Sequence, residues 1–374
     1  MQSGIYITSY DAICNLGNNI DEIFENALKG SNEFLTPLEG IVKDKKFYFG
    51  KVNCELPQIE DERFNLRVNR LLLHLLNNME EKLEQLFAKY PKSRIGTVIA
   101  TTNSGIEEYE KSRNKKHFEI GNSAEFIKHQ LGLEGFCASV STACSSGIKA
   151  FATAKKLIDK GICDAVIVGG TDALSKLPIF GFHSLEILSE NKTNPFSKNR
   201  NGINLGEGAA LFIVEKDTEG IMLKGIGETS DAYHSATPDP KGIEAERAMK
   251  IALKEANLVP DAIDYINLHG TGTKTNDLME VNAVYKLFGC CTEVSATKPL
   301  TGHCLGAAAS IETALCCHII KNNKIIPHVY DGKYDYALPE INLITKPVNK
   351  KINNVLCNAF GFGGTNAVMI LGRE

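Results

Sequence analysis

The chain has 374 residues, 43% of them hydrophobic and 23% charged, and its 41 basic and 45 acidic residues give a net charge of −4. This length fits one large domain or two ordinary ones, and the slightly acidic balance does not predict a nucleic-acid-binding surface. Residues 1–10 are too short and too polar for a signal peptide, and apolar runs such as 165–170 are far too short for a membrane span. The sequence therefore predicts a cytoplasmic protein with no membrane span and no nucleic-acid partner.

Apolar runs with β character alternate with helical patterns along the chain. In the first part, strands are predicted at residues 94–100, 136–140 and 164–169, and helices at 64–76, 123–131 and 145–160. In the second part, strands are predicted at 263–268, 293–296, 355–360 and 367–371, and helices at 244–257, 277–287 and 307–322. This alternation indicates an α/β protein with buried sheets. A seam near 215–225 separates two comparable halves, which we predict to be domains 1–216 and 217–374.

Cys144 lies between the strand predicted at 136–140 and the helix predicted at 145–160. A strand-to-helix turn of this kind places the sulfur at the positive end of a helix dipole, which lowers the pKa of a thiol and favours the thiolate. Backbone N–H groups of the turn also point toward the atom that the sulfur attacks. We therefore predict that the protein is an enzyme and that Cys144 is its nucleophile.

The other cysteines lack this setting. Those in apolar or ordinary helical surroundings are interpreted as small core residues: Cys14, Cys54, Cys137, Cys163, Cys316 and Cys317. No two cysteines have Cys-x-x-Cys spacing, and the adjacent pairs at 290–291 and 316–317 suit a single tetrahedral metal poorly, so no metal site is predicted. An odd total of 11 cysteines favours a reducing compartment over a disulfide framework.

Three glycine-flanked polar motifs follow in the second half. His269 comes directly after a predicted strand, where α/β enzymes keep reactive groups, and the glycines after it allow a substrate to approach closely. The second motif brings Lys298, His303 and Glu312 within fifteen positions. His303 lies near a helix start, where the dipole favours a neutral imidazole that donates hydrogen bonds. In the third motif, 358–366, glycines around Phe360 permit unusual backbone angles and a moving gate.

Five basic side chains would suit an acidic protein partner: Arg63, Arg67, Arg70, Lys198 and Arg200. For each one singly, a solvated charged face is the favoured interpretation. The remaining histidines are interpreted as structural or exposed: His74, His117, His129, His183, His234, His318 and His328.

Cys144, His269 and His303, with their flanking residues, resemble the β-ketoacyl-acyl-carrier-protein synthases of the elongating branch. The similarity covers nearly the whole chain, from residues 5–17 through 202–210 to the loop at Phe360. It implies a thiolase-like α/β fold, in which two similar halves form a five-layer αβαβα stack. It also implies a homodimer, or a heterodimer with a related subunit, and an acyl carrier protein as partner.

The resemblance assigns roles to individual residues. Cys144 would accept the acyl group, with His269 and His303 as catalytic histidines, Lys298 as the catalytic lysine and Glu312 as its partner. Supporting roles would fall on Asp277 and Glu280, pantetheine contacts on Thr271 and Thr273, and carrier docking on Arg67, Arg70, Lys198 and Arg200. Phe360 would be the gate, and its N–H would join that of Cys144 in an oxyanion hole.

The implied chemistry is a decarboxylative condensation. Acyl transfer to Cys144 passes through an oxyanion, malonyl decarboxylation then gives an enolate that two neutral histidines stabilise, and the carbanion attacks the thioester. No metal or redox cofactor is expected, since phosphopantetheine arrives on the carrier. Asn201 replaces the aspartate usual in the family at that position, and the chain is shorter before Cys144 than the fatty-acid enzymes.

Three alternatives remain open. A non-catalytic chain-length factor would lack the thiol, and an initiating synthase would have one histidine and an asparagine where this chain has His303. A degradative thiolase would have a second catalytic cysteine in the last glycine loop; the nearest here is Cys357, which the sequence places in the core. The pathway is open between fatty-acid synthesis and aryl polyene synthesis. Residues 194–204 and 330–339 look closer to the aryl polyene synthases, whereas residues 269–273 and the loop at Phe360 look more like ordinary fatty-acid synthases.

Overall fold

The computed structural model describes residues 4–216 and 219–374. The helices and strands of the first half are β1 (Ile5–Cys14), α1 (Ile20–Leu28), β2 (Thr36–Glu39), β3 (Lys46–Gly50), α2 (Arg67–Asn78), α3 (Glu80–Lys89), β4 (Ile95–Ala100), α4 (Ile106–Ser112), α5 (Asn122–Leu131), β5 (Cys137–Val140), α6 (Ser146–Asp159), β6 (Ala165–Asp172), α7 (Lys176–Ser184), β7 (Leu205–Gly206) and β8 (Gly208–Lys216).

The second half continues with β9 (Ile221–Ser230), α8 (Ile243–Glu255), β10 (Tyr265–Asn267), α9 (Lys274–Phe288), β11 (Glu293–Ser295), α10 (Lys298–Thr301), α11 (Ala308–Asn322), β12 (Lys324–Ile325), β13 (Asn342–Leu343), β14 (Val348–Asn349), β15 (Asn354–Gly361) and β16 (Thr365–Gly372). Each strand and helix that the sequence predicts is present, with its ends within three residues of the prediction. None of the described helices has the length and hydrophobicity needed to cross a membrane.

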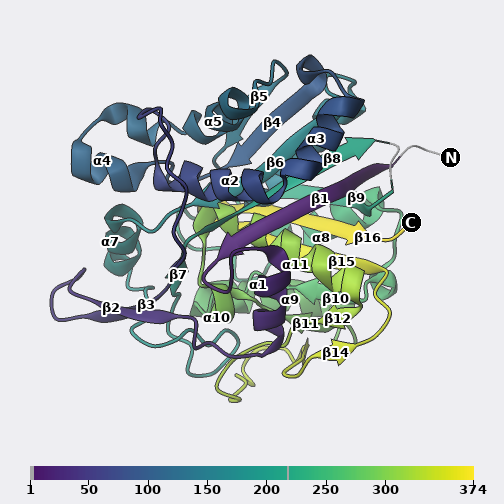
Figure 1. Ribbon diagram of the computed structural model, residues 1–374. Coiled ribbons are helices and arrows are strands. Elements are labelled where there is room, and N and C mark those ends of the chain that lie inside the picture. The colour runs from purple at the N-terminus through teal and green to yellow at the C-terminus, as the bar shows by residue number, and fades with distance from the viewer. Residues whose placement is uncertain (1–3, 217–218) are drawn as a thin grey trace.

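The two halves share one strand order (Figure 1). In the first half the order is β1-β8-β6-β4-β5, and in the second it is β9-β16-β15-β10-β11, with β13 added at the end. In both, the first two neighbouring pairs are antiparallel and the next two are parallel. A short antiparallel contact between β1 and β9, Tyr6 with Met222 and Ile7 with Ile221, joins the two sheets into one.

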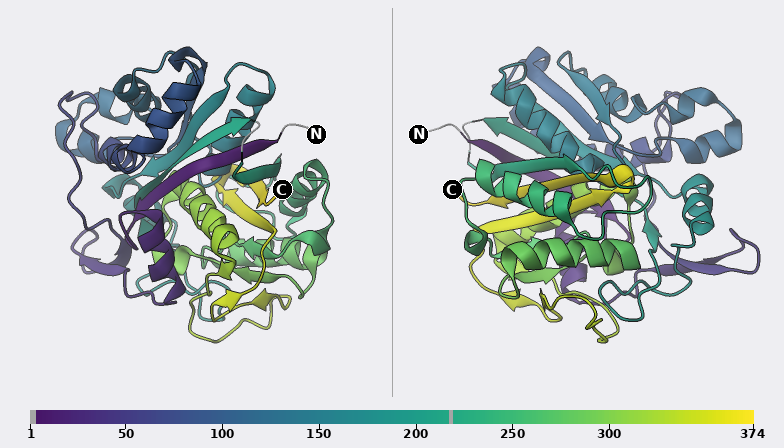
Figure 2. Two further views of the ribbon diagram at one scale, coloured as in Figure 1. Left: turned by 45° about the vertical axis from the view of Figure 1, so that its right-hand side comes forward. Right: turned by 180° about the vertical axis from the view of Figure 1, so that it is seen from behind.

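Three buried clusters show how helices cover these sheets (Figure 2). Helices α2, α3 and α5 pack on the outer face of the first-half sheet through residues such as Leu75 and Ile99. Helices α8 and α9 cover the outer face of the other sheet through residues such as Met249 and Ile370. Between the sheets lies the largest cluster, built around α6 and α11. Helix, sheet, helix, sheet and helix layers follow in turn, as the resemblance implies.

Helix α11 is the centre of the middle layer. Its residues 308–320 are all buried, because it packs on α6 and on strands of both halves. A helix buried on every side must be apolar all round, and this one is built from Ala, Ile, Leu and Cys with few exceptions. The exceptions include Glu312, which therefore needs a specific partner.

The sequence patterns do not predict β1, β8 or β9, which form and join the antiparallel parts of the sheets. Strand β8 is buried along almost its whole length, so it shows no alternation of polar and apolar residues. The domain boundary predicted between residues 216 and 217 falls beside residues 217–218, which lie outside the described residues, and it stays a prediction.

A side structure stands beside the sheets on the side where α7 lies (Figure 1). Strands β2, β3 and β7 form a small sheet of their own. Apolar residues of this sheet and of α7 make a separate buried cluster that includes Phe49, Ile179, Ile203 and Leu305. Leu305 comes two residues after His303, so this cluster adjoins the site described below.

The middle layer provides a test of what stabilises the fold. Leu315→Ala in α11 removes a side chain with no solvent exposure and is expected to lower the free energy of unfolding by about 2–5 kcal/mol. Urea unfolding followed by circular dichroism measures the change. Val259→Ala, at a position that is 65% exposed, is the control and should shift stability by less than about 0.5 kcal/mol. Equal effects of the two variants would contradict the assignment of the core.

Candidate active site

Cys144 lies on the turn between β5 and α6, directly before the first turn of the helix. The turn is held by Ser146, whose Oγ accepts from the Thr142 N–H at 2.8 Å and donates to the Ala143 carbonyl at 2.5 Å. Ala143 has a positive φ of 52°, which is uncommon for a residue with a side chain. These contacts fix the sulfur at the end of the strand, as the sequence predicts.

Gly147 in the first turn of α6 lets the two central helices meet. A Cβ at this position would lie 2.7 Å from the Ser310 backbone nitrogen and 2.9 Å from the Ala309 Cβ. Only glycine allows this approach without a shift of α11. The close contact brings the thiol of one half beside the residues of the other half.

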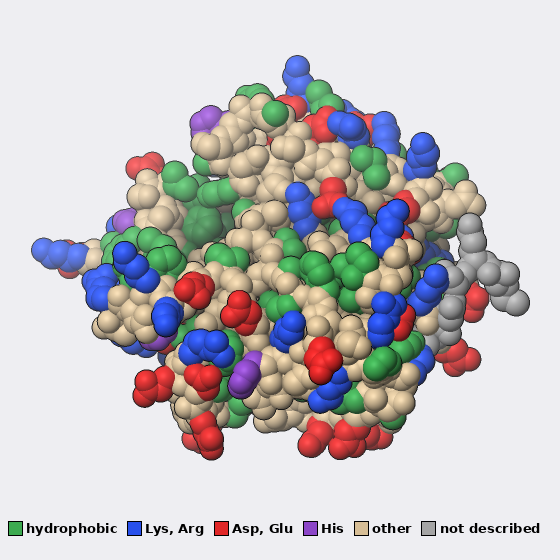
Figure 3. Space-filling model, turned by 90° about the horizontal axis from the view of Figure 1, so that it is seen from above, with side chains coloured by type: hydrophobic (Ala, Val, Ile, Leu, Met, Phe, Trp, Pro, Cys, Tyr) green, Lys and Arg blue, Asp and Glu red, His purple; other side chains and the backbone are tan. Residues whose placement is uncertain are grey.

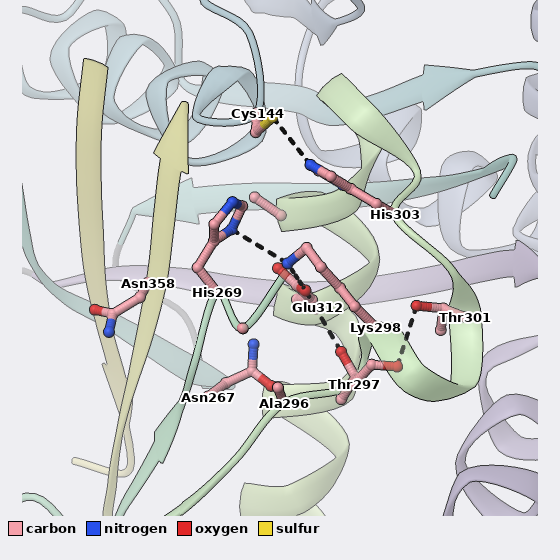
Figure 4. Close-up of polar contacts among 12 residues, drawn as sticks. Cys144, Asn267, His269, Ala296, Thr297, Lys298, Thr301, His303, Glu312 and Asn358 are labelled. Atoms are coloured by element: carbon pink, nitrogen blue, oxygen red, sulfur yellow. Dashed lines mark hydrogen bonds and ion pairs between the residues drawn. The ribbon is translucent and has the colours of Figure 1, made fainter. Parts of the chain in front are cut away.

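His303 follows α10 and faces the thiol (Figure 4). Its Nε2 lies 3.0 Å from the Cys144 Sγ. The Leu305 backbone N–H donates to the His303 Nδ1 at 3.3 Å. Because Nδ1 accepts a hydrogen bond, the proton of the neutral ring is on Nε2, where it points at the sulfur.

His269 occupies the loop after β10, and its ring stands 5.4 Å from that of His303, centroid to centroid. The Lys298 Nζ lies 3.2 Å from the His269 Nδ1 and 2.6 Å from the Glu312 Oε1. An ammonium group can only donate, so Nδ1 accepts and the ring proton is again on Nε2. The predicted pairing of Lys298 with Glu312 is present, and it supplies the partner that a buried carboxylate needs.

Both histidines stay neutral in this setting. Burial and the nearby Lys298 charge hold the pKa of His269 and of His303 well below the ordinary value of 6.5. Ligand atoms of Cys144, His269 and His303 lie within 4.8 Å of one another, which is close enough for a shared metal ion. Metal binding needs an unprotonated nitrogen, however, and both Nδ1 atoms already accept from fixed donors, so Nε2 keeps the proton. The geometry suits hydrogen-bond donation rather than metal ligation.

The thiol departs from the sequence prediction. Burial raises the pKa of Cys144 from 9.0 to about 12, the charges of Glu312 and Asp172 add to the rise, and Lys298 opposes it. The lowered pKa that the helix start predicts is therefore wrong for the substrate-free site. Burial removes the thiolate from water, and this loss of solvation destabilises the anion more than the start of the helix stabilises it. The substrate-free Cys144 therefore rests as a thiol.

Two carboxylates on α9 hold the loop that carries His269. Glu280 accepts the N–H of His269 at 2.6 Å on Oε1 and the N–H of Gly270 at 2.8 Å on Oε2. Asp277 accepts the N–H of Gly272 at 3.1 Å and, from the other half, the N–H of Phe196 at 2.9 Å. Burial raises the pKa of Asp277 to about 6 and that of Glu280 to about 7. Both carboxylates therefore bind the backbone of the His269 loop, and their supporting roles stay predictions.

The side chains of Cys144, His269 and His303 open onto a cavity of about 270 Å³ that reaches the solvent. Thr271 and Thr273 line it, as their predicted contact with pantetheine requires. His234 also lines it and is exposed, which agrees with its interpretation from the sequence as structural or exposed. Nothing in the local sequence distinguishes His234, because only the fold brings its loop to the cavity.

Comparison with known proteins agrees with this site. A family model described as the N-terminal domain of β-ketoacyl synthase matches residues 3–220, and the model of the C-terminal domain matches residues 221–330. The chain belongs to the β-ketoacyl synthase family.

Relatives with curated names support the same placement. A 3-oxoacyl-[acyl-carrier-protein] synthase 2 from Staphylococcus aureus (strain COL) is 29% identical over 98% of this chain and 97% of its own length. The synthase 2 of Coxiella burnetii is 35% identical over 68% of this chain and 66% of its own length. This β-ketoacyl synthase is accordingly an enzyme of the 3-oxoacyl-[acyl-carrier-protein] synthase type.

Solved structures show the thiolase-like fold directly. One of them is the ketosynthase ApeO of Xenorhabdus doucetiae, solved in complex with its chain length factor ApeC. It is 36% identical to this chain and has a TM-score of 0.96, and the match covers 100% of this chain and 98% of ApeO. A β-ketoacyl synthase from Burkholderia phymatum STM815 has a TM-score of 0.89 over the full length of both chains at 23% identity, which supports the fold alone.

Two phenylalanines of the last glycine loop, Phe360 and Phe362, line the cavity. Phe360 is 4% exposed and belongs to β15, where it pairs with Asn366 and packs on the His269 ring. Phe362 is 37% exposed and contacts Phe182. It lies on a short 3-10 turn, Phe362–Gly364, in which Gly363 has a positive φ of 80°. Phe362 is therefore the more exposed of the two, and the gate role of Phe360 stays a prediction.

The predicted docking residues are mostly engaged inside the protein. Arg67 forms an ion pair with buried Glu207, and Arg70 donates to the carbonyls of Pro57 and Leu56. Arg200 is 6% exposed and binds Asp335 at 2.6 Å. The charges of Arg67 and Arg200 are therefore compensated inside the protein, whereas the half-buried Arg70 bonds neutral carbonyls that leave its charge uncompensated. Lys198 is exposed, and its docking role stays a prediction, as does that of Arg70.

Asn201 stands where the family usually has an aspartate. Its side-chain oxygen accepts a hydrogen bond from Ser189, so the substitution retains an acceptor.

Cys357, the candidate for a second thiolase cysteine, is fully buried in β15. It does not line the cavity, and the thiolase alternative loses its main residue.

The raised pKa of Glu280 predicts a pH effect on stability. The unfolded group ionises near 4.5 but the folded group only near 7, so the folded protein keeps a proton that the unfolded chain releases. This stabilisation is complete below about pH 4.5 and is lost as the pH rises through about 7. Glu280→Gln cannot titrate, and its amide nitrogen would face a backbone N–H at a cost of about 1–3 kcal/mol.

The stability advantage of wild type over Glu280→Gln should therefore shrink from pH 5 to pH 8, as measured by urea unfolding across that range. Glu84→Gln, on the exposed side of α3, is the control and should follow the wild-type pH dependence. An advantage that grows with pH would contradict the assigned direction.

Proposed function

We propose that Cys144 carries the growing acyl chain and that His269 and His303 act as neutral hydrogen-bond donors in decarboxylative condensation with a malonyl-carrier. The observation that supports this most directly is the pair of occupied Nδ1 atoms. The Leu305 N–H fills one and the Lys298 ammonium fills the other. Both histidines consequently direct Nε2–H toward the space in front of the sulfur.

Acyl transfer comes first. The Cys144 sulfur attacks the thioester carbonyl of an acyl-carrier, the pantetheine sulfur leaves, and the proton lost by one thiol is gained by the other. The tetrahedral oxyanion needs backbone donors. The Cys144 N–H is one proposed donor. The second is proposed to come from the end of β15, which lies beside it, since a Cβ on Gly361 would be 3.0 Å from the Cys144 nitrogen. Loss of one such donor typically costs about 3 kcal/mol.

Decarboxylation and condensation follow. The malonyl carboxylate leaves as carbon dioxide, and the electron pair moves into an enolate whose oxygen accepts from the Nε2–H of His269 and His303. The α-carbon then attacks the thioester on Cys144. The C–S bond breaks, the Cys144 sulfur takes up one proton, and the 3-oxoacyl product leaves on the carrier. Neutral histidines suit this step because they stabilise the negative charge without giving up a proton.

No bound cofactor takes part in these steps. The phosphopantetheine arm arrives on the carrier and leaves with it, and Thr271 and Thr273 are proposed to contact it in the cavity that they line. The compartment proposed is the cytoplasm. All eleven cysteines are free, including the exposed neighbours Cys290 and Cys291, which fits a reducing environment.

For assembly, we favour a heterodimer with a chain-length-factor subunit over a homodimer. The support is the 36% identical ketosynthase that was solved with its own chain length factor. In this chain β5 is the last strand of the large sheet, so one of its edges has no neighbour among the described strands. An open edge can pair with a strand of another chain. Aryl polyene synthesis is the proposed pathway, because the sequence features that favour it and this relative point the same way.

Carrier docking is proposed at lysines beside the cavity. Lys274 lies between Thr273 and Thr275, which both line the cavity, and Lys198 joins Lys333 through a backbone hydrogen bond. All three lysines are exposed. The face of the protein that Figure 3 shows intersperses basic and acidic side chains. We propose that an acidic carrier recognises the three exposed lysines.

Intact-protein mass tests the chemistry. Incubation with acyl-carriers of different chains, with and without a co-expressed chain-length-factor subunit, should give an acyl adduct that malonyl-carrier discharges as a 3-oxoacyl product. Cys144→Ala should lose the adduct and lower condensation by at least about 10³-fold, while malonyl decarboxylation continues. Cys317→Ala, another buried cysteine, is the matched control and should retain the adduct. Normal condensation by Cys144→Ala would refute the assignment.

Charge reversal tests the docking lysines. The double variant Lys198→Glu and Lys274→Glu is expected to weaken carrier binding about tenfold at low salt, with a smaller effect at high salt because ions screen exposed charges. The affinity for the acyl-carrier is measured by titration at two salt concentrations. Lys82→Glu with Lys254→Glu makes the same charge change on exposed parts of α3 and α8. An equal loss in both double variants would show a non-specific effect of net charge.

A further inference from the structure

Asp172 is a buried carboxylate that the mechanism above does not use. It is the last residue of β6 and has no solvent exposure. Oδ1 accepts from the Thr101 hydroxyl at 2.8 Å and from the Asn103 N–H at 2.9 Å. Oδ2 accepts from the Thr102 hydroxyl at 2.8 Å and from the Gly306 N–H at 2.7 Å. Each oxygen is also 3.1 Å from the Thr102 nitrogen.

These donors come from two distant parts of the chain. Residues 101–103 follow β4 in the first half, and Gly306 belongs to the 3-10 turn Leu305–Ala307, which comes directly after His303 in the second half. One carboxylate thus joins the strand ends of one half to the histidine loop of the other. The approach at Gly306 is tight, since a Cβ there would lie 2.8 Å from the Asp172 Oδ2.

The bonded turn controls the His303 ring. Leu305 has a positive φ of 52°, a conformation that costs a residue with a side chain about 1 kcal/mol or more. In this conformation its N–H reaches the His303 Nδ1, while the next N–H, from Gly306, is held by Asp172. If the Gly306 N–H lost its bond to Asp172, the turn could relax and the Leu305 N–H could move away from the His303 Nδ1.

We propose that Asp172 is a positioning residue that holds His303 as the Nε2–H tautomer facing Cys144. The proposal rests on the function proposed for His303. Asp172 acts through the Gly306 and Leu305 peptides, and it touches neither the substrate nor the reacting sulfur. Asparagine cannot replace it, because each carboxylate oxygen accepts from a backbone N–H, of Asn103 on Oδ1 and of Gly306 on Oδ2, and an amide nitrogen in either place would face that donor.

The sign of the Asp172 charge agrees with this role. A buried anion near Cys144 raises the pKa of the thiol, and Asp172 is among the groups that do so. A residue placed to activate the nucleophile would have the opposite effect. The contribution of Asp172 is therefore to the histidine loop, at some cost to the ionisation of the sulfur.

The test compares Asp172→Asn with Asp164→Asn. Asp164 directly precedes the other end of β6 and forms an ion pair with Arg94 in which both side chains are partly exposed, so it controls for loss of a carboxylate near the same strand. Nitrogen NMR of protein labelled with [15N]histidine reports the tautomer of each ring, and a His303→Ala spectrum identifies the His303 signals. Malonyl-carrier decarboxylation and acylation of Cys144 are measured on the same samples.

Wild type and Asp164→Asn should show the Nε2–H tautomer of His303. Asp172→Asn should show a mixture of His303 tautomers and should slow decarboxylation by about 10- to 100-fold. The acylation rate of Cys144 should fall by less. A general loss of protein stability would lower both rates together. A folded Asp172→Asn with an unchanged His303 tautomer and rate would overturn the proposal. If His303→Ala itself decarboxylates normally, the function proposed for His303 fails instead.

Gly306→Ala provides a second approach to the same contact. Its added methyl group would push against the Asp172 Oδ2 while leaving the carboxylate in place. The variant should shift the His303 tautomer and the decarboxylation rate in the same direction as Asp172→Asn. If Asp172→Asn does not fold, a folded Gly306→Ala with the wild-type tautomer would overturn the proposal on its own.

Discussion

The contact of α6 with α11 at Gly147 is the constraint on which the site depends. It brings two helices together so closely that a single methyl group would collide with the α11 backbone. The thiol precedes one helix and His303 precedes the other, so their 3.0 Å separation follows from how the helices pack. Since each helix is covered by sheets of both halves, neither half can form the middle layer or the site alone.

Enclosure in this layer explains the electrostatics of the site. Burial disfavours every charge there, which raises the pKa of Cys144 and lowers that of both histidines. Burial also raises the pKa of Glu312, and the Lys298 ammonium at 2.6 Å opposes that rise. Neutral histidines are what a developing enolate needs, whereas a neutral thiol is less nucleophilic. The same burial therefore helps the second step of condensation and hinders the first.

Carboxylates that accept only from fixed donors position each catalytic histidine. Glu280 holds the backbone of His269 and Gly270, and Asp172 holds the turn after His303. In both cases the ring itself receives a donor at Nδ1, which leaves Nε2–H for chemistry. The two halves thus use a similar physical arrangement at different places, with the carboxylate on the same half for His269 and on the opposite half for His303.

Much of this protein could be predicted from its sequence. The predicted strands and helices lie within three residues of the observed ones, although β1, β8 and β9 were not predicted. The strand-to-helix turn singled out Cys144, because local conformation depends on nearby residues. The motifs at His269, Lys298 and His303 indicated the family for the same reason, since glycines and polar groups at strand ends are visible along the chain.

Only the tertiary structure decided what depends on contacts between distant segments. Burial reversed the expected pKa shift of Cys144, and buried or half-buried carboxylates compensate the charges of Arg67 and Arg200. The fold also places Phe362 and His234 beside the cavity. Asp172 has no local signal at all, because its donors lie about 70 and 134 positions away. Burial, charge compensation and long-range hydrogen bonds are properties of the packed chain, and local sequence does not encode them.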